Sequence, residues 1–184
     1  MSRLLPSSRR LLRASSRRLY STAPGPPHKI ASDWLAKVSA TDPVTRTQYL
    51  DANQLHLFAL TLNRPQDIPG VDIVNDAPPK GTPIPPGYHW IYFTVPLLEK
   101  DLGIDGTDAS YNPEAPFTRR MWAGGTLSWV GGEKNPLRVG QEVRETTRIL
   151  SADAKVTKRG EEMIVVGLEK VFENEEGVAL IDKR

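Results

Sequence analysis

Hydrophobic residues recur with helical spacing in the first third of the chain. Four of them lie three or four residues apart, as on one face of an α-helix: Ala52, Leu55, Ala59 and Leu62. Asp42 is a suitable N-cap, and Pro43 stands at the first helical position, where its missing N–H costs no hydrogen bond. The pattern predicts an amphipathic helix over Pro43–Leu62, which Pro65 would stop.

The last third of the chain has the alternation of β-strands. The clearest strand spans Glu162–Phe172, where every second residue is apolar at four places: Ile164, Val166, Leu168 and Phe172. Three further segments are strand candidates: Trp122–Val130, Gln141–Leu150 and Val178–Asp182. Helix first and antiparallel strands afterwards indicate an α+β fold. The last strand begins just after the turn at Gly177, and we expect it to be incomplete.

The middle of the chain alternates loops with one helical segment. Residues 64–87 are rich in proline, glycine and aspartate and predict a long loop, which in a compact domain is usually functional. A short helix is expected from Tyr88 towards Lys100, interrupted at Pro96. Residues 103–118 again predict a loop.

The N-terminus has the composition of a mitochondrial presequence. Residues 1–20 contain six arginines with many serines and leucines, and no acidic residue precedes Asp33. Arginines interrupt every apolar run that a secretory signal would need. We expect cleavage before Ser21, a linker over 21–32, a domain over 33–184 that looks truncated, and a matrix location. The alternative is a basic tail that binds nucleic acid or lipid.

Removing the presequence changes the charge of the protein. The whole chain has 24 basic and 22 acidic residues, so residues 21–184 keep 18 basic against 22 acidic ones. An acidic domain does not favour nucleic-acid binding, and no apolar run is long enough to span a bilayer. The absence of cysteine excludes disulfides, thiolate metal sites and a catalytic thiol. Three histidines without helical pairing predict no metal site, and we expect no cofactor.

Known catalytic motifs are missing, but an ordered set of segments stands out. No nucleophile elbow, phosphate-binding loop or dinucleotide fingerprint occurs. His56 lies between core positions of the predicted helix, and we interpret it as a satisfied structural histidine. The set comprises Trp34-Leu35, Ile84–Phe93, Leu102–Gly106, Arg119–Gly125 (RRMWAGG) and Pro136–Gly140 (PLRVG).

Taken together, these segments resemble the N-terminal half of the mitochondrial hydroxyacyl-thioester dehydratases of type 2 and of their bacterial mesaconyl-CoA hydratase relatives, within the MaoC-like hydratases. The resemblance covers about Asp33 to Arg184. It implies a hot-dog fold, a helix wrapped by an antiparallel sheet, here as a single unit. It also implies reversible dehydration of a 3-hydroxyacyl thioester, carried by acyl carrier protein or CoA, in mitochondrial type II fatty-acid synthesis.

The resemblance places the catalytic Asp/His pair in a second hot-dog unit, within a segment that these residues lack. No catalytic residue is therefore assigned, and the partner expected is that second unit or a homodimer mate. Six residues of the matching motifs are candidates for binding substrate: Tyr88, His89, Trp90, Arg119, Arg120 and Trp122. Arginine pairs suit the phosphate of phosphopantetheine. The alternative is that the aromatic residues are core and the arginines are strand-edge charges.

Two functions from different classes stay open at this point. The first is half of a hydro-lyase, a 3-hydroxyacyl-thioester dehydratase. The second is a catalytically empty hot-dog module that binds acyl thioesters or a partner protein. A hot-dog thioesterase is less favoured, because the motifs match the hydratase branch and no thioesterase dyad can be placed.

Overall fold

The computed structural model describes residues 26–184. Its helices are α1 (Pro26–Ser39), α2 (Ala52–Thr61) and the 3₁₀-helices η1 (Pro65–Asp67), η2 (Tyr88–Ile91) and η3 (Glu99–Asp101). Its strands are β1 (Val44–Tyr49), β2 (Thr126–Ser128), β3 (Glu142–Val156), β4 (Glu162–Asn174) and β5 (Gly177–Lys183). The predicted presequence, residues 1–20, lies outside the described residues. Residues 26–32 were predicted as linker, and they form the first half of α1.

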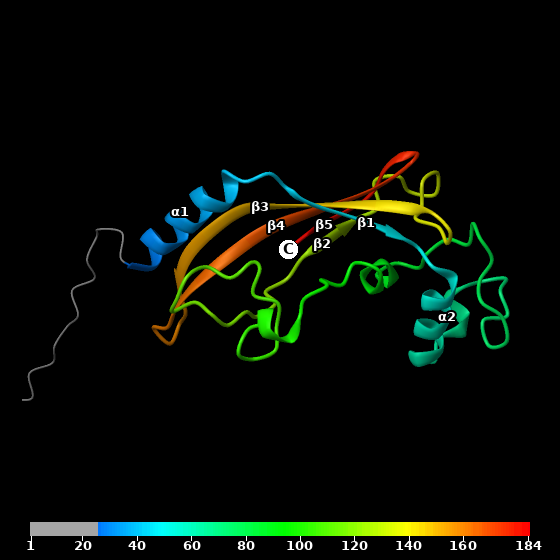
Figure 1. Ribbon diagram of the computed structural model, residues 1–184, viewed down its shortest axis with the longest axis horizontal. Coiled ribbons are helices and arrows are strands. Elements are labelled where there is room, and N and C mark those ends of the chain that lie inside the picture. The colour runs from blue at the N-terminus through cyan, green and yellow to red at the C-terminus, as the bar shows by residue number, and fades with distance from the viewer. Residues whose placement is uncertain (1–25) are drawn as a thin grey trace, which may run out of the picture.

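The five strands form one antiparallel sheet in the order β1-β3-β4-β5-β2. The long strands β3 and β4 arch over the segment that joins α2 to β2, and α1 and α2 lie at opposite ends of the arch (Figure 1). This arrangement confirms the predicted α+β hot-dog fold. It places the loops of the middle of the chain under the sheet.

The helix predicted over Pro43–Leu62 is wrong in its first half. Residues 44–49 form β1, which pairs with Glu142–Thr147 of β3. Their sequence VTRTQY is rich in β-branched and aromatic residues, which favour strands. The true N-cap is Asp51, whose side chain accepts a 2.8 Å hydrogen bond from the Gln54 N–H. Only the second half of the prediction, α2, is confirmed; of its four apolar positions Leu55 and Ala59 are buried, whereas Leu62 lies after the helix and is exposed.

Two shorter predictions are also corrected. The helix expected from Tyr88 to Lys100 is limited to the 3₁₀ turns η2 and η3, with Pro96 between them. The strand expected over Trp122–Val130 is reduced to β2. Next to it, a Cβ on Gly125 would lie 2.8 Å from the Lys183 carbonyl oxygen, so glycine permits the close approach of this segment to β5.

The last strand, β5, is shorter than β3 and β4, and it does not form a free edge. β5 pairs with residues 169–174 of β4 on one side and with β2 on the other. The first part of β4, residues 162–167, pairs with β3 in the described residues and extends past the end of β5. At this margin the free edge within residues 26–184 is therefore β2 together with residues 162–167 of β4.

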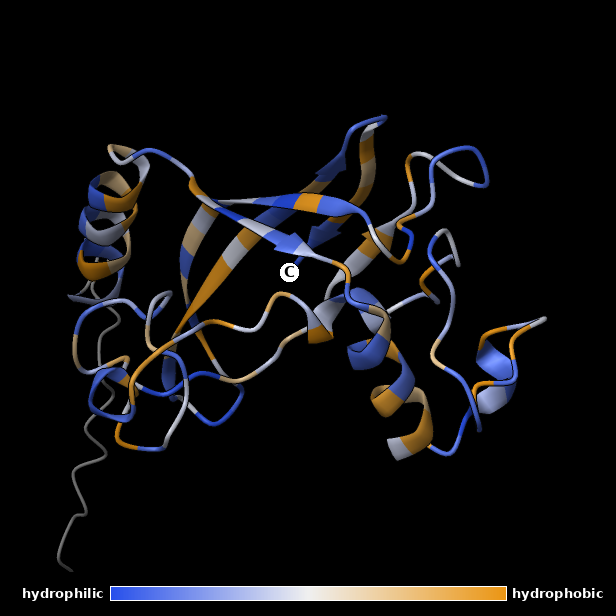
Figure 2. Cartoon of the chain, turned by 45° about the vertical axis from the view of Figure 1, so that its right-hand side comes forward, coloured by the Kyte–Doolittle hydropathy of each residue, from blue (hydrophilic) through white to orange (hydrophobic). Residues whose placement is uncertain are grey.

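The hydrophobic core lies between α2, η2 and one face of the sheet, which we call the inner face. Hydrophobic and hydrophilic bands alternate along the long strands (Figure 2). Phe172 of β4 is fully buried and packs edge to face against Phe93 at 5.0 Å. Leu55 and Leu180 close the core from α2 and β5. The opposite, outer face carries alternate residues such as Arg144 and Glu173.

No helix within residues 26–184 combines the length and the apolar character that crossing a membrane requires.

Candidate functional site

The η2 turn and the residues after it cross the inner face of the sheet. Gly87 precedes the turn with a φ of 86°, a left-handed conformation that glycine adopts without steric cost. α2 holds the turn from one side, because Gln54 Nε2 donates to the Ile91 carbonyl oxygen at 2.6 Å. The Tyr92 hydroxyl donates to the Asp51 carbonyl oxygen at 2.7 Å. The segment is therefore tied firmly to the N-terminus of α2.

Tyr88 is one of the predicted binding residues, and its hydroxyl is already used. It donates to Asp67 Oδ2 at 2.7 Å, and its ring packs edge to face on Phe58. Burial, reinforced by the Asp67 carboxylate, raises the pKa of the Tyr88 hydroxyl to about 12. The same hydrogen bond lowers the pKa of Asp67. This geometry gives Tyr88 a structural role, in line with the alternative stated for the aromatic residues.

A buried cluster of charges holds the far end of the η2 segment. Glu145 of β3 is 1% exposed and accepts hydrogen bonds from Lys170 of β4, from the Thr147 hydroxyl at 2.8 Å and from Arg46 of β1 at 2.8 Å. Arg46 also donates to the carbonyl oxygens of Phe93 and Thr94, each at 3.0 Å. The Arg46–Glu145–Lys170 cluster therefore joins three strands to the segment that follows η2.

A second buried carboxylate, Asp182 of β5, holds the other side of the turn. It is 1% exposed and accepts a 3.2 Å hydrogen bond from Trp90 Nε1. Arg184 donates to the same oxygen, Oδ2, at 2.7 and 2.9 Å. The guanidinium of Arg184 lies 5.4 Å from the Trp90 ring centre and 5.2 Å from that of Trp122. Two of the predicted tryptophans thus meet through a cation–π stack.

His89 lies between these two charged clusters. Its side chain is 2% exposed and packs against the rings of Phe172 at 5.0 Å and Trp90 at 5.4 Å. Its Nε2 atom is buried without a hydrogen-bond partner in the structure. Burial lowers the pKa of His89 to about 4, against the opposing effect of Asp182. The imidazole is therefore neutral at pH 7.

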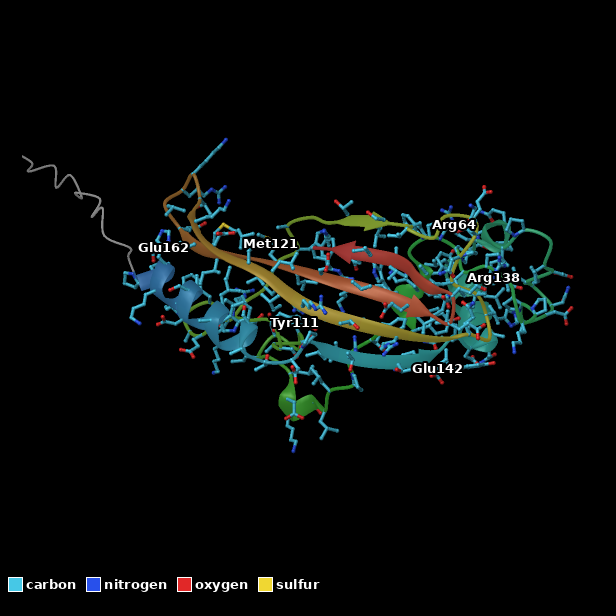
Figure 3. The ribbon with its side chains drawn as sticks, turned by 90° about the horizontal axis from the view of Figure 1, so that it is seen from above. Arg64, Tyr111, Met121, Arg138, Glu142 and Glu162 are labelled. Atoms are coloured by element: carbon cyan, nitrogen blue, oxygen red, sulfur yellow. The ribbon has the colours of Figure 1, made fainter. Side chains whose placement is uncertain are left out.

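The two predicted arginines do not join this group. Arg120 lies 3.9 Å from Asp108 and 6.0 Å from the Tyr111 ring centre. Arg119 is exposed, and within residues 26–184 its side chain makes no hydrogen bond or ion pair. Seen from above, Tyr111 lies beside β3, whereas Met121 lies on the other side of the long strands (Figure 3). The loop between them therefore crosses the direction of the strands.

The charged residues of the inner face were missed by the sequence prediction, although one of them left a signal. The residues involved are Arg46, Glu145, Lys170, Asp182 and Arg184. Lys170 stands between Leu168 and Phe172 at the period-two position that faces the core. A charge at such a position is rarely buried unless it is paired. The contacts of Asp182 and Arg184 with Trp90 join distant parts of the chain and have no local signature.

Two other features of the structure bear on the search for a site. His56 was interpreted as a satisfied histidine, but its buried Nε2 has no partner, so that interpretation is wrong. A cavity of about 700 Å³ lies on the outer face and is lined by charges of both signs, among them Lys80, Arg144 and Glu173. It is separated from His89 by the sheet. Within residues 26–184 no group of three or more acidic or histidine residues is placed to hold a metal.

Comparison with known proteins matches a region that contains most of the charged and aromatic residues of the inner face, although not Arg46. A family model described as hydroxyacyl-thioester dehydratase type 2 matches residues 87–184. The match begins at the glycine before η2 and includes His89, Trp90, Glu145, Lys170 and Asp182. A curated relative, the mesaconyl-C(4)-CoA hydratase of Chloroflexus aurantiacus, is 28% identical over 147 residues. Those residues are 79% of this chain and 47% of the relative, so the chain spans about half the relative's length.

Proposed function

Since this chain belongs to the hydroxyacyl-thioester dehydratase type 2 family, we propose that it forms one hot-dog unit of an enzyme that removes water from a 3-hydroxyacyl thioester. The observation that carries the proposal is the family match over residues 87–184, which contains η2 and the strands β2 to β5. The similarity to a hydratase that acts on a CoA thioester supports the same substrate class.

The reaction sets requirements that the described residues meet only in part. A base must take the α proton, an acid must protonate the leaving hydroxyl, and the thioester carbonyl must be polarised. His89 is the histidine of the inner face, but it is 2% exposed, and Asp182 is 1% exposed and bonded to Trp90 and Arg184. His89 and Asp182 therefore do not form an acid–base pair that is open to a substrate. We therefore assign the proton transfers to a second hot-dog unit.

The shared length supports this division. The alignment of 147 residues covers 47% of the Chloroflexus relative, which leaves the other half of that protein for a second unit. In the arrangement we propose, this chain is the N-terminal unit. It shapes the acyl site and supports the catalytic unit.

The free edge at β2 is the surface we propose for that second unit. β2 pairs with β5 on one side, and an edge strand offers unpaired N–H and C=O groups on the other. Large hydrophobic side chains stand beside it in exposed positions: Met121, Trp122, Trp129 and Val130. A second hot-dog unit that continues the sheet would cover both features. A homodimer formed through β2 is the alternative that the experiment below distinguishes.

The place of the reaction is the mitochondrial matrix in this proposal. It rests on residues 1–20, which carry six arginines and no acid. A matrix dehydratase of this family would act on acyl groups bound to acyl carrier protein during fatty-acid synthesis. Mass spectrometry of the protein from purified mitochondria tests this, with Ser21 expected as the first residue and an intact Met1 as the contrary result.

Hydration of crotonyl-CoA, followed as loss of the enoyl absorbance, tests the enzymatic proposal. The 184-residue chain alone is expected to be inactive. Activity is expected when the chain is mixed with the part of the Chloroflexus hydratase that lies outside its 147-residue alignment with this chain. The mixture should elute as a heterodimer. Turnover by the chain alone that is lost in His89→Ala would make this unit a self-sufficient enzyme.

One observation favours a second candidate function, a catalytically empty binding module. Within residues 26–184 the buried histidine and carboxylates are all packed against protein groups rather than open to solvent. For such a module the mixture would stay inactive, while the chain alone would still bind acyl thioesters.

A further inference from the structure

His89 is the one polar side chain of the turn Tyr88–Tyr92 whose capacity for hydrogen bonding is left unused. The hydroxyls of Tyr88 and Tyr92 donate to Asp67 and Asp51, and the Trp90 indole donates to Asp182. Nε2 of His89 is buried and has no partner in the structure. A buried polar atom without a partner costs free energy, so each instance in a folded protein calls for an explanation.

The turn is also held on both sides by hydrogen bonds to charged side chains. Arg46 binds the carbonyl oxygens that follow it, and Asp182 binds Trp90 within it. Both anchors belong to ion pairs between a half-buried arginine and a buried carboxylate, Arg46 with Glu145 and Arg184 with Asp182. A loose turn could rotate and satisfy the imidazole elsewhere, but this turn cannot do so without breaking those bonds. The unpaired nitrogen is therefore fixed in place.

We propose that Nε2 of His89 binds an uncharged oxygen of the acyl thioester, either the 3-hydroxyl or the thioester carbonyl, so that the η2 turn forms part of the substrate-binding site of this unit. This inference rests on the function proposed above and names a residue that makes the contact. His89 acts here as a binding residue, because no proton transfer is assigned to it.

The surroundings of the imidazole select this kind of ligand. Its low pKa keeps it neutral at pH 7, and a neutral imidazole nitrogen either donates or accepts one hydrogen bond. The cations beside it, Lys170 and Arg184, are already paired with Glu145 and Asp182. A neutral oxygen adds no unpaired charge to this buried region, whereas an ion would. Hydroxyl and carbonyl oxygens both match these demands.

The route to His89 passes by Trp90. The Trp90 ring lies 5.4 Å from the imidazole, yet 42% of the residue is exposed, so it reaches from the core to the surface. Arg184 rests on it and on Trp122, which is 60% exposed. The other ring against His89, Phe172, is fully buried in the core. In this proposal an acyl group reaches Nε2 when the Trp90 side chain moves and gives up its bond to Asp182, while Arg46 still holds the backbone after the turn.

Imidazole ¹⁵N NMR of the 184-residue chain tests the contact directly. The three histidines are assigned with single substitutions, and the chain is titrated with 3-hydroxybutyryl-CoA, crotonyl-CoA and free CoA. We expect a saturable shift of the His89 Nε2 resonance with the acyl thioesters and no shift with free CoA. A shift with both acyl thioesters identifies the carbonyl as the bound oxygen, and a shift with 3-hydroxybutyryl-CoA alone identifies the hydroxyl.

Binding measured by calorimetry supplies a second readout with a matched control. Loss of one hydrogen bond in His89→Leu is expected to raise the Kd of 3-hydroxybutyryl-CoA about tenfold. His89→Asn keeps a donor and an acceptor and should recover part of the affinity. His56→Leu removes a half-buried imidazole on α2 whose Nε2 also lacks a partner within residues 26–184, and it should leave the Kd unchanged.

The outcomes separate this inference from the function it rests on. An unshifted His89 resonance at saturation, or an unchanged Kd in His89→Leu, overturns the role of His89 and leaves the proposed function standing. If no acyl thioester binds the wild-type chain, the role of His89 in this unit fails, and the crotonyl-CoA assay of the mixture still decides the proposed function. Should the leucine variant not fold, the titration of the wild-type resonance still decides the matter.

Discussion

The two faces of the sheet carry the same kinds of charges in different surroundings. On the inner face, Glu145 is paired with Arg46 and Lys170, all of them buried or half-buried. On the outer face, one residue away along β3, Arg144 lies 3.9 Å from Glu173 with 62% and 36% of the side chains exposed. Water screens the outer pair and is excluded from the inner cluster. The comparison shows that burial, more than the pairing itself, decides what a charge does for this fold.

The largest expected effect comes from breaking the inner cluster. Glu145→Gln leaves Lys170 and Arg46 in the core without their carboxylate, and we expect the free energy of unfolding to fall by about 3–5 kcal/mol. Urea denaturation measures it. Glu173→Gln, the matched change on the outer face, should shift stability by less than about 0.5 kcal/mol. Equal losses in the two variants would contradict the comparison.

His89 makes the inner face sensitive to acid. Its pKa falls from about 6.5 in the unfolded chain to about 4 in the fold, so the unfolded chain binds more protons between these values. The contribution of His89 to the free energy of unfolding is therefore fully present above pH 6.5. It is lost as the pH falls towards 4, by up to about 3 kcal/mol. Urea midpoints measured across this range test it.

The comparison for that experiment is His89→Leu, which cannot titrate. The wild-type curve minus the variant curve isolates the imidazole from the carboxylates that also titrate below pH 6. A difference that stays flat from pH 7 to 4 would mean that His89 is protonated as easily in the fold as in the unfolded chain.

Trp90 and Trp122 both contact Arg184, and the difference between them gives a third contrast. Trp90 donates Nε1 to the buried Asp182, whereas Trp122 contacts Arg184 from the exposed side. Trp90→Phe removes the hydrogen bond to a charged acceptor, and we expect a loss of about 1.5–3 kcal/mol by thermal or urea unfolding. Trp122→Phe keeps an aromatic face over Arg184 and should cost under about 1 kcal/mol. Comparable losses would show that Asp182 does not depend on the indole.

The sequence could predict the parts of the fold that repeat with a period. α2 and β4 follow apolar spacing, β5 follows the turn at Gly177, and the antiparallel order of the later strands led to the right fold class. Asp42-Pro43 has the sequence of a helix start and competes with the strand propensity of Val44–Tyr49, so the local sequence does not decide β1. What decides β1 is its pairing with β3, about a hundred residues away.

The candidate site was predictable only at its η2 end. Tyr88, His89 and Trp90 stood out as a motif, and Lys170 could have been noticed as a charge at a core position. Asp182 could not be assigned to the site, because its contact with Trp90 joins residues 92 apart in the chain. Arg119 and Arg120 were grouped with the site by their motif, yet the fold leaves them exposed and apart from His89.

A similarly small effect is expected from the second outer pair, Lys183 with Glu169. Their charged atoms lie 3.1 Å apart, closer than in the Arg144–Glu173 pair, so geometry alone would rank this pair as the stronger of the two. The lysine side chain is nevertheless 59% exposed, and screened pairs of this kind contribute about 0–1 kcal/mol. We expect Lys183→Gln to change stability within that range. The remaining difference should vanish in 1 M NaCl, where the Debye length is about 3 Å. The Glu145→Gln loss should persist in the same salt, because ions do not enter the inner cluster. If salt removed both effects alike, the charges around Glu145 would be open to solvent, and the distinction between the two faces would fail.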